Sequence, residues 1–84
     1  MQPIQALLSR IRWDADWAKD DFRIGYYDRI EQQVLMVAFK ELIFPKNDHF
    51  SFELIDEEGR LHAVPYHRVK AVYRNGRLIW HRER

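Results

Sequence analysis

Four histidines and a set of nearby arginines are the side chains in this sequence best suited to holding a charged ligand. Three of the histidines, His62, His67 and His81, lie in the last third of the chain, where arginines are frequent. An arginine beside a histidine can hold a phosphate, because the guanidinium offers a planar fork of donors and a protonated imidazole adds another. These residues therefore have two interpretations, a phosphate site near the C-terminal end or an ordinary solvated face of a sheet.

Other chemistries fit these histidines less well. Metal sites favour imidazoles at His-x-His or helical spacing with a carboxylate or thiolate, and neither spacing occurs. Two-histidine phosphoesterases that act on RNA ends carry His-x-Thr or His-x-Ser, whereas the triplets here are HAV, HRV and HRE. The chain has no cysteine and only three glycines, which argues against thiolate catalysis and a glycine-rich phosphate loop. We therefore expect no metal, no cofactor and no catalytic residue.

Length and composition indicate one small domain with a local basic region. The chain has 84 residues, of which 46% are hydrophobic, so we expect a single domain over residues 1–84. We recognise no apolar run long enough to span a membrane and no signal peptide, and we expect a cytoplasmic protein. The formal net charge is +1, but residues 60–84 hold seven basic residues and one acidic residue. Such a segment attracts anions locally.

Hydrophobic periodicity predicts a helix followed by strands. In residues 3–12, four apolar side chains share one helical stripe: Ile4, Leu7, Leu8 and Ile11. Residues 22–30 alternate as in a strand, and the side chains predicted on its apolar face are Phe22, Ile24, Tyr26, Asp28 and Ile30. The apolar run 34–39 suggests a central strand, with a buried helical turn as the alternative, and residues 49–64 are typical of a hairpin. We therefore predict an α+β fold, with an N-terminal helix packed on a mostly antiparallel sheet of about five strands.

The chain ends in a second predicted hairpin, in which Asn75-Gly76 is the preferred two-residue turn. Counting outward pairs Arg74 with Arg77 and ends by pairing Arg68 with Glu83. In this register one face is apolar and is expected to join the core: Val69, Ala71, Tyr73, Leu78 and Trp80. The other face is mainly basic and is expected to lie in solvent: Arg68, Lys70, Arg74, Arg77 and His81, with Val72 and Ile79 between them.

Three polar side chains continue these apolar faces, so we expect them at the rim of the core. His67 and Arg82 lie at the open end of the apolar hairpin face, and Asp28 continues the apolar face of residues 22–30. A partly buried charge needs a partner. We therefore expect an ion pair between Asp28 and either Arg82 or His67.

Four segments occur in an order that resembles a known family. They are RIRWD at residues 10–14, IGYYDR at 24–29, VPYHRVKAVYRNG at 64–76 and LIWHRE at 78–83. Together they resemble the DUF504 family, also called the MJ1316-type domain, over nearly the whole chain. The usual family ending is Trp-Asp-Arg or Trp-Glu-Arg, whereas this chain has Trp80-His81-Arg82.

The resemblance implies that the protein binds RNA 3′ ends bearing a 2′,3′-cyclic phosphate or a related terminal phosphate, in RNA processing or repair. Other RNA-processing proteins are further expected partners. The family's motif residues correspond to Asp28, Arg29, His67, Arg68, Trp80 and Arg82, and Tyr26 and Tyr66 are added as aromatic side chains that could stack on a base. The predicted RNA-binding residues are Tyr26, Asp28, Arg29, Tyr66, His67, Arg68 and Arg82. We expect His67, Arg68 and Arg82 to contact the phosphate and Asp28 to orient one of them. Tyr26 or Tyr66 would stack on the last base.

Two alternatives stay open at this point. The first is a phosphoesterase or transferase that acts on such ends with His67 as general acid or base. The absence of an evident second acid or base makes us favour binding over catalysis. The second is a protein-interaction module that uses the basic C-terminal hairpin. The sequence does not determine the oligomeric state.

Overall fold

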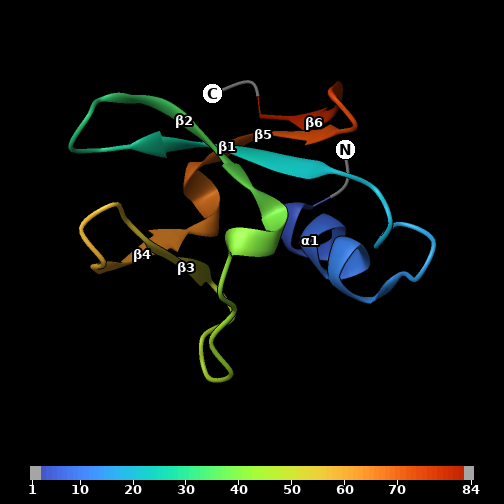
Figure 1. Ribbon diagram of the computed structural model, residues 1–84, viewed down its shortest axis with the longest axis horizontal. Helices are drawn as coiled ribbons and strands as arrows, with labels where there is room; N and C mark the ends of the chain where they lie inside the picture. The colour runs from blue at the N-terminus through green and yellow to red at the C-terminus, as the bar shows by residue number, and fades with distance from the viewer. Residues whose placement is uncertain (1–2, 83–84) are drawn as a thin grey trace.

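The computed structural model describes residues 3–82 as one helix and six strands (Figure 1). The helix is α1 (Ile4–Trp13), and two short 3-10 helices are η1 (Phe39–Glu41) and η2 (Tyr66–Arg68). The strands are β1 (Phe22–Asp28), β2 (Gln33–Ala38), β3 (Ser51–Ile55), β4 (Leu61–Pro65), β5 (Val69–Arg74) and β6 (Arg77–His81). The α+β class is confirmed, with six strands where about five were expected.

The strands form two antiparallel sheets. The larger sheet has the order β2-β1-β5-β6, and β3 pairs with β4 in a separate hairpin. Figure 1 shows the larger sheet at the top, with α1 and the β3–β4 hairpin below it. One face of the larger sheet is therefore covered, and the core lies between that face, the helix and the hairpin.

The helix forms as its sequence predicts. Its apolar stripe is buried, and the stripe consists of Ile4, Leu7, Leu8 and Ile11. Pro3 precedes the first turn in an extended conformation, where the missing N–H of proline costs no helical hydrogen bond. In the part of the chain that the structure describes, no helix is both long and apolar enough to cross a membrane.

Phe52 is the centre of the aromatic part of the core. Its side chain is fully buried, and the ring of Tyr26 meets it edge-on at a centroid distance of 6.3 Å. The ring of Tyr66 stacks on Phe52 at 6.2 Å. Phe52 therefore joins the larger sheet, through Tyr26, to the β3–β4 hairpin and η2, which follows that hairpin.

The expectation that residues 34–39 form a central strand is wrong. β2 is an edge strand, and Val34 and Met36 each expose 51% of their surface. Its apolar side chains fall on both faces of the sheet, so a continuous apolar run did not mean burial on both sides. Ile30 also lies outside the core, at 83% exposure, because β1 ends at Asp28.

The C-terminal hairpin has the predicted turn but a different register beyond it. Asn75 and Gly76 both have positive φ, and Arg74 pairs with Arg77 as expected. After Tyr73 and Leu78, however, Val72 pairs with Trp80, so Ile79 is an extra residue in β6. The expected pairing of Arg68 with Glu83 lies outside the described residues.

A second bulge lies between β1 and β5. Gly25 pairs with Ala71 and Tyr26 with Val69, so Lys70 is an extra residue in β5. The two bulges place Val69, Val72 and Trp80 on the core face, where all three are buried. Val69 and Trp80 were correctly expected there.

The bulges also invert most of the expected faces of this hairpin. Leu78 is 46% exposed, and Ala71 and Tyr73 lie with it on the opposite face from the core, so their assignment to the core was wrong. Val72 was expected on the solvated face and is fully buried.

The residues of the expected basic face do not all lie on one side of the sheet, because Arg74 lies on the core side and His81 on the opposite side. Arg74 pairs with Phe22, which is buried, and so lies at the rim of the core face. Its guanidinium donates from Nε to Asp20 Oδ2 at 2.6 Å and lies 4.7 Å from the centre of the Trp17 ring. Through these contacts with Asp20 and Trp17, Arg74 links the segment between α1 and β1, residues 14–21, to the end of the sheet.

Candidate nucleic-acid interface

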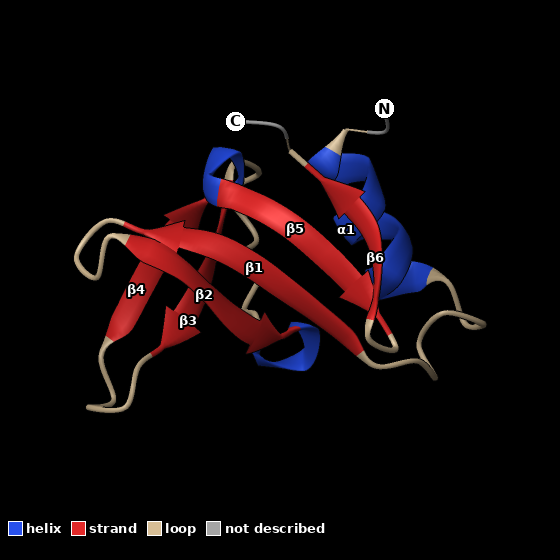
Figure 2. Ribbon diagram, turned by 90° about the horizontal axis from the view of Figure 1, so that it is seen from above, coloured by secondary structure: helices blue, strands red, loops and turns tan. Residues whose placement is uncertain are grey.

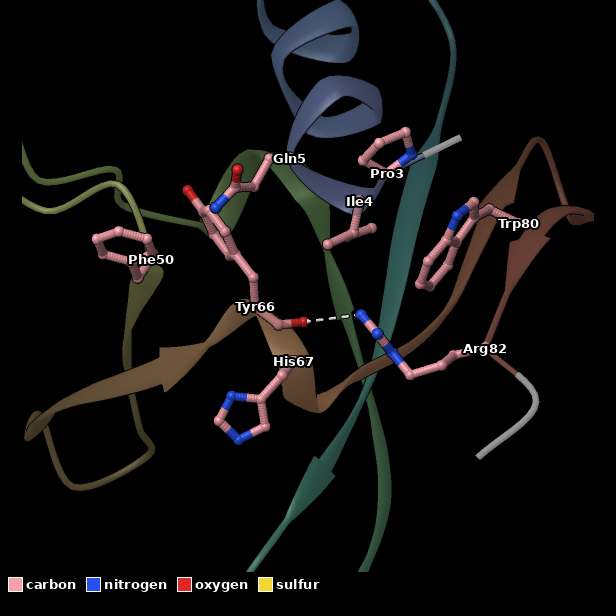
Figure 3. Close-up of a pocket in the computed structure, with 8 residues that line it drawn as sticks. All are labelled: Pro3, Ile4, Gln5, Phe50, Tyr66, His67, Trp80 and Arg82. Carbon is pink, nitrogen blue, oxygen red and sulfur yellow. Dashed lines mark hydrogen bonds between the residues drawn. The ribbon is translucent and has the colours of Figure 1, made fainter. Parts of the chain in front are cut away.

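A pocket of about 440 Å³ lies where the start of α1, η2 and the end of β6 meet (Figure 3). Eight residues line it: Pro3, Ile4, Gln5, Phe50, Tyr66, His67, Trp80 and Arg82. Three of the predicted RNA-binding residues, Tyr66, His67 and Arg82, are therefore brought to one place. The pocket combines a cation, an imidazole and aromatic rings.

Two hydrogen bonds fix the wall of the pocket that contains Phe50. The backbone N–H of Tyr66 donates to the carbonyl of Phe50 at 2.8 Å. The side-chain amide of Gln5 donates to the carbonyl of His49 at 2.9 Å. These bonds tie the segment before β3 to η2 and to the first turn of α1, so the exposed ring of Phe50 stands on an anchored backbone.

Arg82 is held at the mouth of the pocket by backbone carbonyls. Its Nε donates to the carbonyl of Val69 at 3.1 Å, and its Nη2 donates to the carbonyl of Tyr66 at 3.4 Å. The guanidinium carbon lies 5.2 Å from the centre of the Trp80 ring. An arginine has five N–H groups, and these contacts use two of them, so within residues 3–82 three are left for a ligand.

His67 lies beside this arginine but differs from it in exposure. Its place in η2 puts it on a tight turn between β4 and β5, and its side chain is exposed. Figure 3 shows the imidazole and the Tyr66 ring pointing to opposite sides of the η2 backbone, with the Arg82 guanidinium directed at that backbone. His67 can therefore meet a ligand from the solvent side of the pocket.

Tyr66 presents a neutral phenol next to Phe50. Burial is the main influence on its hydroxyl and raises the pKa of Tyr66; Arg12 lowers it and Asp48 raises it. Because one side of its ring is stacked on Phe52, Tyr66 is a rigid apolar wall with a polar tip.

The other predicted site residues lie elsewhere. Arg29 is exposed in the turn after β1, and Arg68 is at the end of η2 but does not line the pocket. Tyr26 packs against Phe52, and burial, followed by the charge of Asp28, raises the pKa of its hydroxyl. Tyr26 is therefore part of the core more than of a binding surface.

The expected ion pair of Asp28 with Arg82 or His67 is absent from the contacts of the described residues. The Oδ1 atom of Asp28 instead accepts the backbone N–H groups of Ile30, at 2.8 Å, and Glu31, at 3.2 Å. This is an aspartate that closes the turn between β1 and β2. Arg82 is oriented by carbonyl oxygens in place of a carboxylate.

Sequence reasoning missed the walls contributed by Pro3, Ile4, Gln5 and Phe50. The helix residues lie far from residue 82 in sequence, and no local pattern shows that the first turn of α1 ends beside β6. Phe50 carried no signal of exposure either, because strand alternation places it on the same face as Phe52, which is buried. Within residues 3–82, no group of three or more metal-ligating side chains converges.

With this geometry established, comparison with known proteins identifies the family. The family model described as the MJ1316 RNA cyclic group end recognition domain matches residues 1–82. The chain belongs to this family. The MJ1316 match covers all the elements described above, so the resemblance of the four segments is confirmed. Neither the curated proteins nor the solved structures compared with the chain gave a match.

Proposed function

We propose that the protein binds RNA 3′ ends carrying a 2′,3′-cyclic phosphate, in the pocket formed by α1, η2 and β6. The observation that carries this proposal is the Arg82 guanidinium, fixed by two backbone carbonyls at a pocket with aromatic walls. The family description, which names recognition of RNA cyclic group ends, supports the same ligand. RNA processing or repair is the setting in which such ends arise.

Arg82 supplies the phosphate contact. A cyclic phosphate is compact and singly charged, and its two free oxygens match a planar fork of N–H donors. The guanidinium keeps its orientation without ligand, because the carbonyls of Val69 and Tyr66 hold it. His67 adds an imidazole N–H donor from the solvent side.

The aromatic side chains receive the last base. Tyr66 is the better of the two tyrosines that we considered, because it lines the pocket whereas Tyr26 is packed on Phe52. Phe50, with 75% of its surface exposed, offers a second stacking surface. Arg68 and Arg29 lie outside the pocket, and we assign them to the RNA backbone beyond the terminal nucleotide. Asp28 acts indirectly, by forming the turn that carries Arg29.

The deciding experiment compares three RNAs that differ only in their 3′ end: hydroxyl, 3′-phosphate and 2′,3′-cyclic phosphate. We expect the cyclic end to bind most tightly. Arg82→Lys should weaken that binding about tenfold, or about 1.4 kcal/mol, because a lysine cannot form the same fork. The same change should hardly affect the hydroxyl end. Thermal melting of the variant is the control for folding.

Equal affinity for all three ends would contradict the proposal. The same reactions also address catalysis: if the recovered RNA carries a new 3′ end group that disappears with His67→Ala, the protein is an enzyme that opens or transfers the phosphate. If the RNAs bind without end preference while a protein partner binds tightly at physiological salt, the interaction-module alternative is correct.

A further inference from the structure

The larger sheet has a second face that no other element of residues 3–82 covers. Figure 2 views the molecule from above and shows β1, β2, β5 and β6 in front, with α1 and the β3–β4 hairpin behind them. Figure 1 agrees, since no described helix or strand lies above the sheet in that view. We refer to this surface as the outer face. Its side chains, given by strand pairing and burial, are Arg23, Gly25, Tyr27, Val34, Met36, Ala38, Ala71, Tyr73, Leu78 and His81.

The outer face is apolar enough to resemble a core. Three of its residues belong to the C-terminal hairpin: Ala71, Tyr73 and Leu78. Sequence alternation alone had assigned these three to the interior. Val34 and Met36 are half exposed on β2. Contiguous apolar side chains left exposed on a protein are typical of binding surfaces.

The middle of the outer face is a row that crosses all four strands. Met36 pairs with Gly25, Gly25 with Ala71, and Ala71 with His81. Gly25 has no side chain there; a Cβ atom at this position would lie 3.1 Å from the sulfur of Met36 and 3.3 Å from a methyl of Val34. The two central strands carry small residues in this row, and the side chains of Met36 and Val34 pack over Gly25, which is buried.

Tyrosines stand on both sides of this row, one on each central strand. Tyr27 lies two residues beyond Gly25 on β1, and Tyr73 lies two residues beyond Ala71 on β5, in the opposite direction across the sheet. Aromatic side chains on the central strands of an open four-stranded sheet are the arrangement on which RNA bases stack in other folds. Stacking is tolerant of sequence because every base has a π face.

The outer face carries no negative charge of its own that would repel RNA. None of its ten residues is acidic, and Arg23 is basic, with its guanidinium paired to Asp21 beside the face at 3.2 Å. The row also leads to the pocket, because His81 on the outer face is followed directly by Arg82 at the pocket mouth. A strand of RNA with its end at Arg82 would therefore reach the outer face by passing His81 at the edge of β6.

We propose that the outer face binds the single-stranded nucleotides that precede the RNA 3′ end, with bases stacked on Tyr27 and Tyr73. This rests on the proposed function, in that it takes RNA as the ligand, but it concerns a different surface and a different part of the RNA. These stacking contacts do not involve the end group, so they should contribute equally to the binding of RNAs with hydroxyl and with cyclic phosphate ends.

The test uses a dinucleotide and an eight-nucleotide RNA, each with a hydroxyl or a cyclic phosphate end. The double variant Tyr27→Leu, Tyr73→Leu keeps apolar bulk but removes the rings, and should weaken binding of the longer RNA about tenfold or more with either end. Binding of the cyclic dinucleotide should be unchanged. The matched control, Tyr27→Phe with Tyr73→Phe, keeps the rings and should bind the longer RNA as the parent does.

A second pair of variants avoids the half-buried tyrosines. Met36 lies on the exposed edge strand, so Met36→Glu and Met36→Gln should both fold. The carboxylate of Met36→Glu should repel the RNA backbone and weaken binding of the longer RNA about tenfold at low salt. Met36→Gln, which adds no charge, should reduce that affinity much less.

The outcomes separate this inference from the proposed function. If the leucine and Met36→Glu variants bind the longer RNA like the parent, the outer face is not an RNA surface, whatever Arg82→Lys does. If they lose affinity while end preference is missing in the parent, the pocket proposal fails and the outer face stands. Sedimentation of the parent without RNA provides the last check, because a dimer that Met36→Glu dissociates would show that a second copy covers this face.

Discussion

The two faces of the larger sheet are built from the same strands and differ mainly in what covers them. On the core face Ile24, Val69 and Val72 are fully buried against the helix and the hairpin. On the outer face Val34 and Met36 are each 51% exposed although they are just as apolar. Apolar alternation therefore shows that a strand has two different faces, but it does not show which of them is covered.

The bulges decide which face of the C-terminal hairpin points inward. The extra residues Lys70 and Ile79 shift the alternation once in β5 and once in β6. A shift of one residue moves the following side chains to the other face. Val69 and Val72 can therefore both lie in the core although their spacing of three does not fit a regular strand.

Substitutions on β6 should show the largest difference between the two faces. Trp80 is buried on the core face, so Trp80→Ala should lower the free energy of unfolding by about 3–5 kcal/mol, close to the whole stability of a small domain. Leu78 is 46% exposed on the outer face, so Leu78→Ala should cost about 1 kcal/mol. Equilibrium urea unfolding of both variants measures the difference.

Similar losses from the two variants would contradict this assignment of faces. An equal large loss would mean that Leu78 is covered in solution, for example by another copy of the chain. A small loss for both would mean that Trp80 is not part of the core. Unfolding of the parent at several protein concentrations separates the first of these cases, since the unfolding of a dimer depends on protein concentration and Leu78→Ala should then reduce that dependence.

Local signals predicted the parts of the fold that depend on neighbours in sequence. The stripe Ile4, Leu7, Leu8 and Ile11 defined the helix, and Asn75-Gly76 defined the last turn, because both patterns act over a few residues. The bulges at Lys70 and Ile79 had no such signal. They form because Val69, Val72 and Trp80 must all reach one core, which is a requirement of the assembled structure.

The candidate site shows the same division. Tyr66, His67 and Arg82 were predicted and line the pocket together. The argument that placed His67 and Arg82 at the rim of the core needed only the end of one hairpin. Asp28 was expected beside them, but its carboxylate accepts hydrogen bonds from two backbone N–H groups of its own turn. A local backbone partner is always within reach of an aspartate in a turn, whereas a distant arginine must be brought to it.

Enlarging a side chain should also affect the stability of the two faces differently, by less than the truncation of Trp80. Val72 is fully enclosed, so Val72→Ile should overpack the core and cost about 1–3 kcal/mol. Gly25→Ala on the outer face should change stability by less than about 0.5 kcal/mol. Its Cβ displaces the flexible, half-exposed Met36, and the loss of glycine freedom in the unfolded chain offsets the crowding. Thermal melting of both variants checks the comparison, and a clearly destabilised Gly25→Ala would mean that Met36 is held in place.

The smallest expected effect compares two ion pairs that β1 and β5 direct to different faces. Arg74 lies at the rim of the core face and pairs with Asp20, with side-chain exposures of 35% and 23%, while Arg23 on the outer face pairs with Asp21 at 54% and 56%. The hydrogen bond from Arg74, and then one from Asn75, holds the pKa of Asp20 below its ordinary value of 3.8. Because the folded-state pKa of Asp20 is lower than its ordinary value, the stabilisation is fully present above pH 3.8 and is lost as the pH falls through the pKa of the folded protein.

Asp20→Asn should therefore lower the melting temperature at pH 7, and the difference from the parent should shrink as the pH approaches 3. Asp21→Asn is the matched control and should melt close to the parent at pH 7, since exposed pairs contribute little. If the Asp20→Asn difference stayed constant between pH 7 and pH 3, the carboxylate charge would not be what fastens residues 14–21 to the sheet.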